Sequence, residues 1–220
     1  MSNVLILKSS INGPASLTNQ LIDEYMQTRR EAGHQDSVVE HDLTTLALPK
    51  LDGALFAALR GAQDSRPEIQ QGVALSDSLI GELKASDLLV IGAPMYNLNV
   101  PTDLKNWFDL VARARETFRY TETWPQGLVE GVRAVVISSR GGVHDGQPSD
   151  AVTPYLRAVL GLMGISDVEF IYAEGMDIRP HGRDAGIAHA RQQIARAAQQ
   201  ARAPFFIRIR AGKGSFFILE

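Results

Sequence analysis

Short apolar runs that alternate with amphipathic segments are the feature that most constrains how this chain can fold. Each run is too short for a typical helix and suits a buried strand. The expected strands cover residues 4–7, 35–42, 88–92, 132–138 and 168–172. Because strands that alternate with helices form parallel sheets, this pattern predicts an α/β protein with helices on both faces of the sheet.

The segments between the runs place apolar side chains at helical spacing. Leu17, Leu21 and Tyr25 would share one face of a helix that stops at Gly33, and Pro67 suits the first turn of another. Further helices are expected at 54–59, from about Thr102, and over 151–163 and 185–203. Right-handed crossovers between the strands then give a doubly wound, five-stranded parallel sheet.

Three loops follow the carboxyl ends of central strands in this arrangement. They cover residues 8–18, 93–101 and 138–144. In doubly wound sheets, ligands bind outside the carboxyl ends of the strands, at the point where the strand order reverses. These loops are therefore the first place to look for a binding site.

Composition excludes several classes of function. The 220 residues include no cysteine, so thiol chemistry is excluded and redox chemistry would need a bound cofactor. A formal net charge of −3 gives no reason to expect nucleic acid or an anionic membrane as a partner. No apolar stretch approaches the roughly 18 residues of a membrane span. The N-terminus also lacks a signal-peptide pattern, so we expect a cytoplasmic protein.

The first loop offers hydroxyl groups rather than a glycine-rich phosphate motif. Ser10, Ser16 and Thr18 lie between a strand end and a helix start. Hydroxyls and free N–H groups at a helix N-terminus can bind a phosphate, aided by the helix dipole. The alternative is that Ser16 only caps the helix.

The second loop could hold a flat ligand. Met95, Tyr96 and Asn97 lie between Pro94 and Pro101, and they could supply an apolar flank and polar groups along a ring edge. The alternative is a rigid turn whose methionine and tyrosine pack into the core.

The third loop contains paired glycines, Gly141 and Gly142, which would let the backbone approach a ligand closely. The alternative is an ordinary glycine turn. His144 is a candidate proton donor near neutral pH, although a surface or structural role would also explain it.

Together these motifs resemble those of the bacterial FMN-dependent NADH:quinone reductases and azoreductases of the flavodoxin-like superfamily. The likeness spans roughly residues 1 to 200, and its motifs are specific as a set rather than singly. The segments that carry it are residues 7–10, 16–21, 93–97, 101–109, 118–121 and 139–142.

The resemblance implies a flavodoxin-like domain over residues 1–203 that binds FMN. Its phosphate would contact Ser10, Ser16, Leu17 and Thr18. Its ring would lie against Pro94, Met95, Tyr96, Asn97 and Leu98, and its pyrimidine edge against Ser139, Arg140, Gly141 and Gly142.

Members of this family are homodimers with the active site at the subunit interface. The resemblance places Tyr120 in the wall of the substrate pocket there, with Leu162 at a second pocket position. The family often has aromatic residues where this chain has Leu98 and Leu162, which could weaken stacking on flat substrates. It often has serine where this chain has Thr18, which keeps the hydroxyl.

The implied activity is a ping-pong reaction. NADH or NADPH would give hydride to the bound FMN and leave, and a quinone or azo compound would then take it; an azo bond would need two cycles to yield amines. The protein supplies position and electrostatics. No side-chain acid or base is required, no metal is expected, and His144 is the one candidate for proton transfer.

Three other functions fit the sequence less well. An electron-carrying flavodoxin would usually be smaller and strongly acidic. A hydrolase acting on phosphopantetheine thioesters or phosphodiesters would need a nucleophile, but there is no cysteine and no Gly-x-Ser-x-Gly elbow. A purely structural dimer would not need Ser10, Asn97 and the glycine pair. The sequence names neither the physiological acceptor nor the preferred nicotinamide donor.

Residues 204–220 form an extension beyond the resemblance. Two apolar segments flank a glycine-containing turn, which predicts a β-hairpin that packs on its own subunit or on the dimer partner. The alternative is a disordered extension or a non-native addition.

Overall fold

A computed structural model of the protein describes residues 1–179 and 181–200. The predicted hairpin at 204–220 lies outside the described residues, as do the last residues of the predicted domain and of the predicted final helix.

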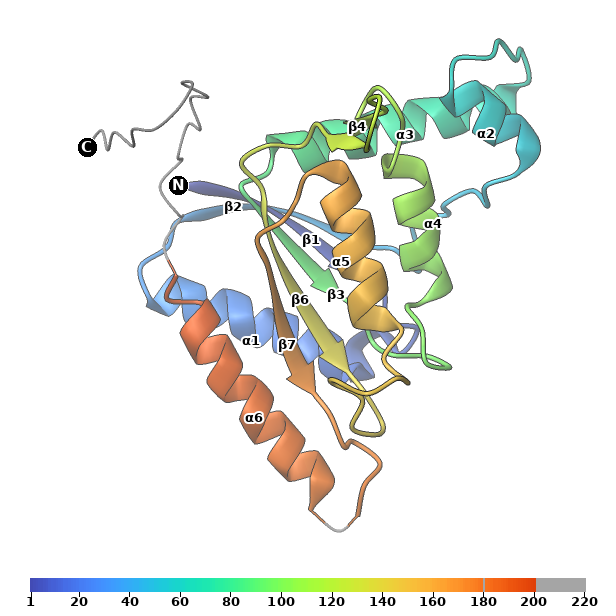
Figure 1. Ribbon diagram of the computed structural model, residues 1–220. Helices are drawn as coiled ribbons and strands as arrows, with labels where there is room; N and C mark the ends of the chain where they lie inside the picture. Colours follow the sequence, from blue (N-terminus) through green and yellow to red (C-terminus); the bar gives the residue numbers. More distant parts are fainter. Residues whose placement is uncertain (180, 201–220) are drawn as a thin grey trace.

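Five parallel strands form the central sheet, in the order β2-β1-β3-β6-β7 (Figure 1). The order reverses between β1 and β3, which makes their carboxyl ends the switch point. The prediction of a doubly wound, five-stranded parallel sheet is therefore confirmed. The strands are β1 (Ser2–Lys8), β2 (Asp36–Asp42), β3 (Leu88–Gly92), β6 (Arg133–Ser139) and β7 (Val168–Ala173).

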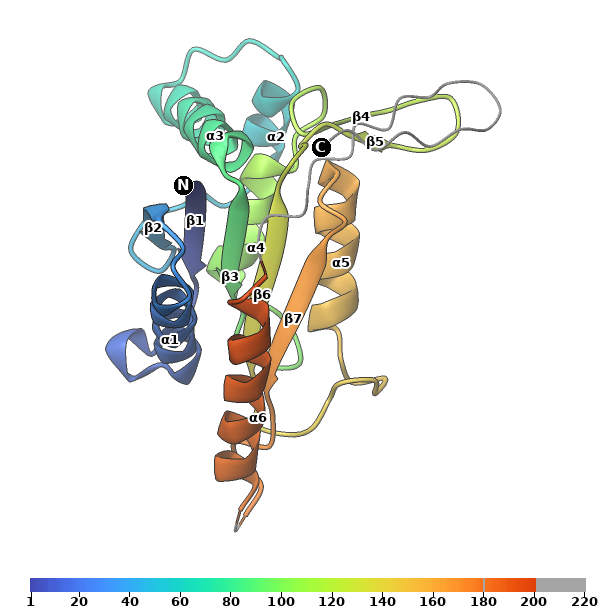
Figure 2. The same cartoon turned by 90° about the vertical axis from the view of Figure 1, so that its left-hand side faces the viewer.

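Helices cover both faces of this sheet (Figure 2). One face carries α1 (Leu17–Glu31) and α6 (Gly182–Ala197). The other face carries α3 (Pro67–Ala85), α4 (Thr102–Val111) and α5 (Val152–Met163), and α2 (Gly53–Leu59) packs against α3.

Burial on both faces explains why the central strands read as continuous apolar runs. In β1, Val4 and Ile6 face the layer of α1 and α6, whereas Leu5 and Leu7 face the opposite layer. Strand β2 lies at an edge and leaves its two valines about half exposed, which explains its weaker apolar pattern.

Helix termini follow the predicted signals with small shifts. Helix α1 begins after Ser16, whose side chain accepts a hydrogen bond from the Asn19 N–H, and α3 begins at Pro67 as predicted. The final helix begins at Gly182, three residues before the predicted start at Ala185, and ends at Ala197.

A short antiparallel hairpin was not predicted from the sequence. It pairs β4 (Phe118–Arg119) with β5 (Gln126–Gly127), and strands of two residues leave no periodic pattern. The hairpin packs on the carboxyl end of α5: a Cβ atom at Gly127 would lie 2.2 Å from the Gly164 nitrogen. Because α5 runs opposite to the strands, the hairpin lies at the amino ends of the strands, away from the three loops (Figures 1 and 2).

Candidate functional site

The three loops meet around one cavity of about 330 Å³ at the carboxyl ends of β1, β3 and β6. The connection from β7 to α6 closes its fourth side. The lining residues are Ser10, Asn12, Ala15, Ser16, Leu17, Pro94, Met95, Tyr96, Ser139, Arg140, Gly141, Met176, Asp177 and Arg183.

One end of the cavity is the N-terminus of α1. The N–H of Asn19 is satisfied by Ser16 Oγ at 3.2 Å, and the N–H of Gln20 by the Ser16 carbonyl at 3.1 Å. The N–H groups of Leu17 and Thr18 have no acceptor among the described residues. Free N–H groups at the positive end of a helix dipole bind anions, so this end suits a phosphate.

Two hydroxyl contacts tie the loops together. Ser10 Oγ lies 2.9 Å from the Tyr96 hydroxyl, which also accepts the Ile11 N–H at 3.3 Å. Thr18 Oγ1 lies 2.7 Å from Ser139 Oγ. Thr18 is fully buried and lies beneath the cavity rather than in its lining. Its side chain therefore braces the loops, with its hydroxyl committed to Ser139 rather than to a ligand.

The second loop ends in a strained two-residue turn. Tyr96 and Asn99 exchange backbone hydrogen bonds of 2.9 and 3.0 Å, and the two residues between them have positive φ angles, 49° at Asn97 and 67° at Leu98. Asparagine tolerates this region, whereas a leucine there costs roughly 1–2 kcal/mol. Leu98 is 48% exposed, so core packing does not explain its presence. Asn97 and Leu98 lie outside the cavity lining, next to Tyr96.

The glycine pair holds backbone close to its neighbours. A Cβ atom at Gly141 would lie 2.4 Å from Asp177 Oδ2, and one at Gly142 would lie 2.9 Å from His144 Nε2. The two carbonyls accept hydrogen bonds from Asp177 and Gly175 at 3.0 and 2.9 Å. The N–H groups of Gly141 and Gly142 have no acceptor in the described part of the chain. Gly141 lines the cavity, so its N–H can face the polar edge of a ligand, whereas Gly142 lies next to it outside the lining.

The Arg140 side chain is fully buried and committed to other protein groups. Its guanidinium donates to Asp150 at 2.9 Å, to Glu174 at 3.3 Å and to Thr153 Oγ1 at 2.9 Å. It also lies 4.4 Å from the ring centroid of Tyr172. Arg140 therefore reaches the cavity only through its backbone, and its side chain anchors the glycine loop.

The carboxylates around Arg140 complete this anchor. Burial alone would raise the pKa of the Asp150 carboxyl, but hydrogen bonds from Thr153 and Arg140 outweigh it and hold that pKa below its usual value. Glu174 also accepts the backbone N–H groups of His144 and Asp145, at 2.7 and 2.9 Å. The Glu174 carboxylate thus binds Arg140 on one side of the glycine pair and the His144 and Asp145 N–H groups on the other, which fixes the loop between them.

His144 lies behind the glycine pair. Its Nδ1 is 2.8 Å from Ser149 Oγ, and its ring is not part of the cavity lining. Among the described residues, Ser149 is the one side chain that forms a hydrogen bond with the His144 ring.

Sequence reasoning missed the fourth side of the cavity. Met176 and Asp177 come from the connection between β7 and α6, and Arg183 is the second residue of α6. The glycines of this segment, Gly175 and Gly182, form no recognised phosphate-binding motif in the sequence. The position of that connection, after the strand next to β6, was the only available signal.

The two predicted substrate-pocket residues lie far from this cavity in the same chain. Tyr120 follows β4 in the hairpin and is 64% exposed. Leu162 lies in the last turn of α5, beside the same hairpin. The structure brings Tyr120 and Leu162 to one end of the molecule, but that end is opposite to the three loops.

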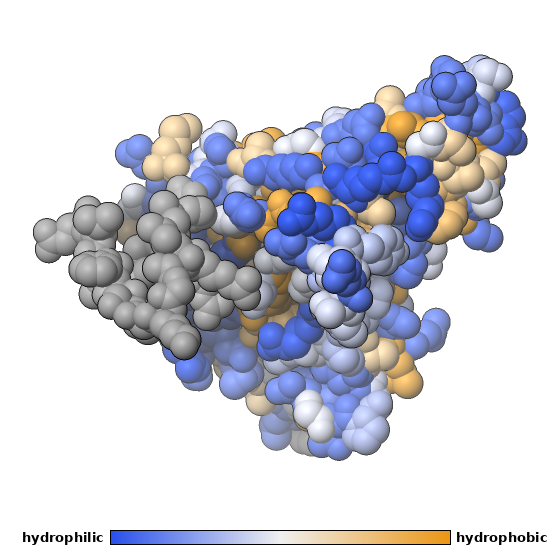
Figure 3. All heavy atoms as spheres, turned by 45° about the horizontal axis from the view of Figure 1, so that its top comes forward, coloured by the Kyte–Doolittle hydropathy of each residue, from blue (hydrophilic) through white to orange (hydrophobic). Residues whose placement is uncertain are grey.

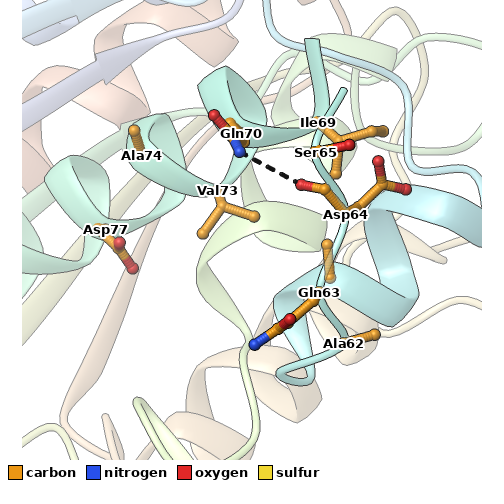
Figure 4. A pocket seen from close by; sticks show the side chains of 10 residues that line it. Ala62, Gln63, Asp64, Ser65, Ile69, Gln70, Val73, Ala74 and Asp77 are labelled. Carbon is orange, nitrogen blue, oxygen red and sulfur yellow. Dashed lines mark hydrogen bonds between the residues drawn. The ribbon is translucent and has the colours of Figure 1, made fainter. Parts of the chain in front are cut away.

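A larger pocket of about 660 Å³ lies between α2 and α3 (Figure 4). Its acidic side chains, Asp64 and Asp77, are paired with Arg66 and Arg113. None of the three loops contributes to it. The three-loop cavity is therefore the better candidate site.

The surface at the end of the molecule that carries α3 and the hairpin is mixed: hydrophilic residues interrupt the apolar ones (Figure 3).

The described residues contain neither a membrane-spanning helix nor a cluster of metal ligands. No helix there is both long and apolar enough to cross a membrane. No group of three or more histidine, aspartate or glutamate side chains is placed to hold a metal ion in that part of the chain.

Comparison with known proteins supports the architecture and the motifs together. Residues 2–198 match a family described as having a flavodoxin-like fold. The chain is 66% identical over 194 residues to FMN-dependent NADH:quinone oxidoreductase 4 of Burkholderia lata, a match that covers 88% of this chain and 98% of that protein.

The chain belongs to the FMN-dependent NADH:quinone oxidoreductase family. Another family member, from Aeromonas salmonicida, is 55% identical over 195 residues, covering 88% of this chain and 97% of its own. Among solved structures, an azoreductase from Bacillus anthracis superposes with a TM-score of 0.81 at 28% identity and covers 90% of this chain and 99% of its own. The family resemblance and the flavodoxin-like fold predicted from the sequence are both confirmed.

Proposed function

We propose that this protein is an FMN-dependent oxidoreductase that passes hydride from NADH to quinones and cleaves azo compounds reductively. The observation that carries the proposal is the three-loop cavity, which offers free N–H groups at both ends. The family relatives supply the donor and acceptor, since their names state an FMN-dependent reaction of NADH with quinones. The azo activity comes from the Bacillus anthracis azoreductase.

The residues present fit FMN. At one end, the N–H groups of Leu17 and Thr18 and the hydroxyl of Ser16 would hold the phosphate. At the other end, the N–H groups of Gly141 and Gly142 would donate to the polar edge of the ring. A ligand with a dianionic group and a flat polar edge suits this set better than a purely apolar one.

Bound FMN would supply the ability to accept and return hydride. The chain supplies position: Pro94 and Met95 would give the ring an apolar flank, and the Tyr96–Ser10 contact would hold two loops at a fixed spacing. Fixed N–H donors of the glycine pair would favour negative charge on the adjacent ring edge without reorganisation. No side-chain acid or base is assigned a step.

The visible spectrum of the purified protein, followed by anaerobic addition of NADH, tests this function. A flavin spectrum that bleaches with NADH and recovers with excess quinone, over many turnovers, is the expected result. A protein that stays colourless and inactive after incubation with FMN would contradict the proposal. A flavin-loaded protein that is reduced but does not turn over quinone would favour the electron-carrier alternative instead.

The strained turn gives a prediction in which stability and binding change in opposite directions. Replacing Leu98 with asparagine should raise the free energy of unfolding of the apoprotein by about 1 kcal/mol, because asparagine adopts positive φ more readily. The same change should weaken FMN binding, because we propose that Leu98, which lies next to Tyr96 outside the cavity lining, contacts the apolar part of the ring when FMN is bound. Urea unfolding and flavin fluorescence titration would measure the two effects. Tighter FMN binding in the variant would contradict the proposed contact.

A homodimer would explain how Tyr120 can belong to a substrate pocket although it lies far from the cavity of its own chain. Because the hairpin lies opposite to its own cavity, Tyr120 can wall a cavity only in another subunit, as a two-fold arrangement would allow. The outer face of α5 supports such an interface, since Pro154, Ala158 and Gly161 are exposed there and Arg157 is the only charged residue of that helix. We therefore propose a homodimer built on α5 and the hairpin.

Replacing Ala158 with glutamate should convert the proposed dimer to monomer, because the change places a charge on the apolar face of α5. Light scattering during size-exclusion chromatography would measure the mass. The matched control is Ala188→Glu, an exposed alanine on α6 that should leave the mass unchanged. A wild-type protein that is already monomeric would refute the interface, as would an Ala158→Glu variant that remains dimeric.

A further inference from the structure

Helices α1 and α6 lie side by side on one face of the sheet and are joined by an ion pair. Arg191 donates two hydrogen bonds of 2.8 Å to Glu24. Both helices follow a parallel strand, so both have their N-termini at the carboxyl ends of the strands (Figure 1). About two turns before this ion pair lie Leu17 on α1 and Arg183 on α6. The ion pair therefore aligns the start of α6 with the start of α1.

Arg183 lines the three-loop cavity together with Ser16 and Leu17. Its side chain is exposed and has no ion pair or hydrogen bond within the described residues. By contrast, six arginines in the described chain pair with carboxylates: Arg29, Arg66, Arg113, Arg133, Arg140 and Arg191. An unpaired guanidinium in the same cavity lining as the start of α1 gives the cavity a preference for an anion.

One carboxylate shares the cavity with Arg183. Asp177 Oδ2 lies against Gly141, close enough to exclude a Cβ atom there. No ion pair joins Asp177 to Arg183 among the described residues. Asp177 therefore lies against the glycine pair, and the Arg183 charge in the same cavity is not neutralised by it.

We propose that Arg183 is a phosphate-binding residue for FMN, brought by α6 to the N-terminus of α1. This inference rests on the proposed function and deepens it. A guanidinium offers paired donors that match phosphate oxygens. It would add a full positive charge to a site whose other groups are N–H donors and a hydroxyl. None of the segments that carry the family resemblance contains this residue.

The test compares FMN with riboflavin, which has the same ring and no phosphate. Apoprotein of wild type and of Arg183→Gln is titrated with each flavin, and binding is followed by quenching of flavin fluorescence. FMN affinity should fall about tenfold in the variant, in keeping with a charge-assisted contact at an exposed position, while riboflavin affinity stays unchanged. Arg183→Lys should recover part of the loss, because it keeps the charge without the paired donors.

The matched control is Arg179→Gln. Arg179 is an exposed arginine on the connection between β7 and α6, and it does not line the cavity. It should leave both affinities unchanged. Thermal unfolding of the apoproteins should be the same for all variants, which excludes a general loss of structure.

Three results would overturn the inference. Equal losses for FMN and riboflavin would place Arg183 at the ring rather than at the phosphate. Unchanged FMN affinity with a raised KM for NADPH alone would assign it to the phosphate of the incoming donor. Unchanged behaviour toward all ligands would leave it as a solvated arginine. A wild-type protein that binds no FMN would instead contradict the proposed function itself.

Discussion

Replacing Arg140 with methionine should lower the free energy of unfolding by about 3–5 kcal/mol and abolish measurable FMN binding. The guanidinium is fully buried and holds Asp150, Glu174 and Thr153 together. Without it, two carboxylates are left in a buried region without a counterion. Glu174 would then lose its fixed position and release the His144 and Asp145 N–H groups, so the glycine pair would no longer be held at the cavity.

Arg140→Lys should restore little of this loss. A lysine keeps the charge but cannot bond three acceptors in the directions that the planar guanidinium uses. Urea unfolding gives the stability change, and FMN titration of the apoprotein gives the binding change.

The matched control for this variant is Arg29→Met. Arg29 is also buried and pairs with Asp36 through hydrogen bonds of 2.8 and 2.9 Å, but it lies near the end of α1 and the start of β2, away from the cavity. The Arg29→Met variant should lose a comparable amount of free energy of unfolding, while its FMN affinity in the folded state stays unchanged. If the Arg140→Met variant remains folded and binds FMN as tightly as the wild type, Arg140 does not anchor the glycine loop.

The sheet could be predicted because the central strands are buried on both faces. Such strands need no alternation, so runs such as residues 88–92 stand out against the surrounding polar sequence. The hairpin at Phe118–Arg119 and Gln126–Gly127 could not be predicted, because it is held by contacts with the end of α5 rather than by its own pattern.

The site was predictable to the extent that topology determines it. The switch-point rule identified three loops, and Ser10, Met95 and Gly141 do line one cavity. The rule could not separate a residue that lines the cavity from one that supports it. Thr18 and Arg140 read as binding residues in the sequence, yet the Thr18 side chain braces two loops and the Arg140 side chain anchors one.

Long-range contacts explain most of the remaining differences. Asp150 and Glu174 gain their roles only when β6, β7 and α5 pack together, and no short motif records such a meeting. Arg183 likewise reaches the cavity because α6 packs beside α1. Position in the fold, rather than local sequence, gives these residues their surroundings.

Replacing Ser16 with aspartate should separate folding from cofactor binding. Aspartate caps helices about as well as serine, and its charge at the N-terminus of α1 is favourable to the helix dipole. Stability should therefore be unchanged or slightly higher. The same carboxylate would face the phosphate of FMN across a nearly buried position, so FMN affinity should fall by about a hundredfold or more through like-charge repulsion.

Ser16→Asn is the matched control, because asparagine has the same shape as aspartate and also caps helices, but carries no charge. It should keep most of the FMN affinity. Riboflavin affinity should be similar in wild type, Ser16→Asn and Ser16→Asp, since none of them changes the ring end of the cavity. If Ser16→Asp binds FMN as tightly as Ser16→Asn does, the phosphate does not lie at the start of α1. In that case the free N–H groups of Leu17 and Thr18 would need another ligand.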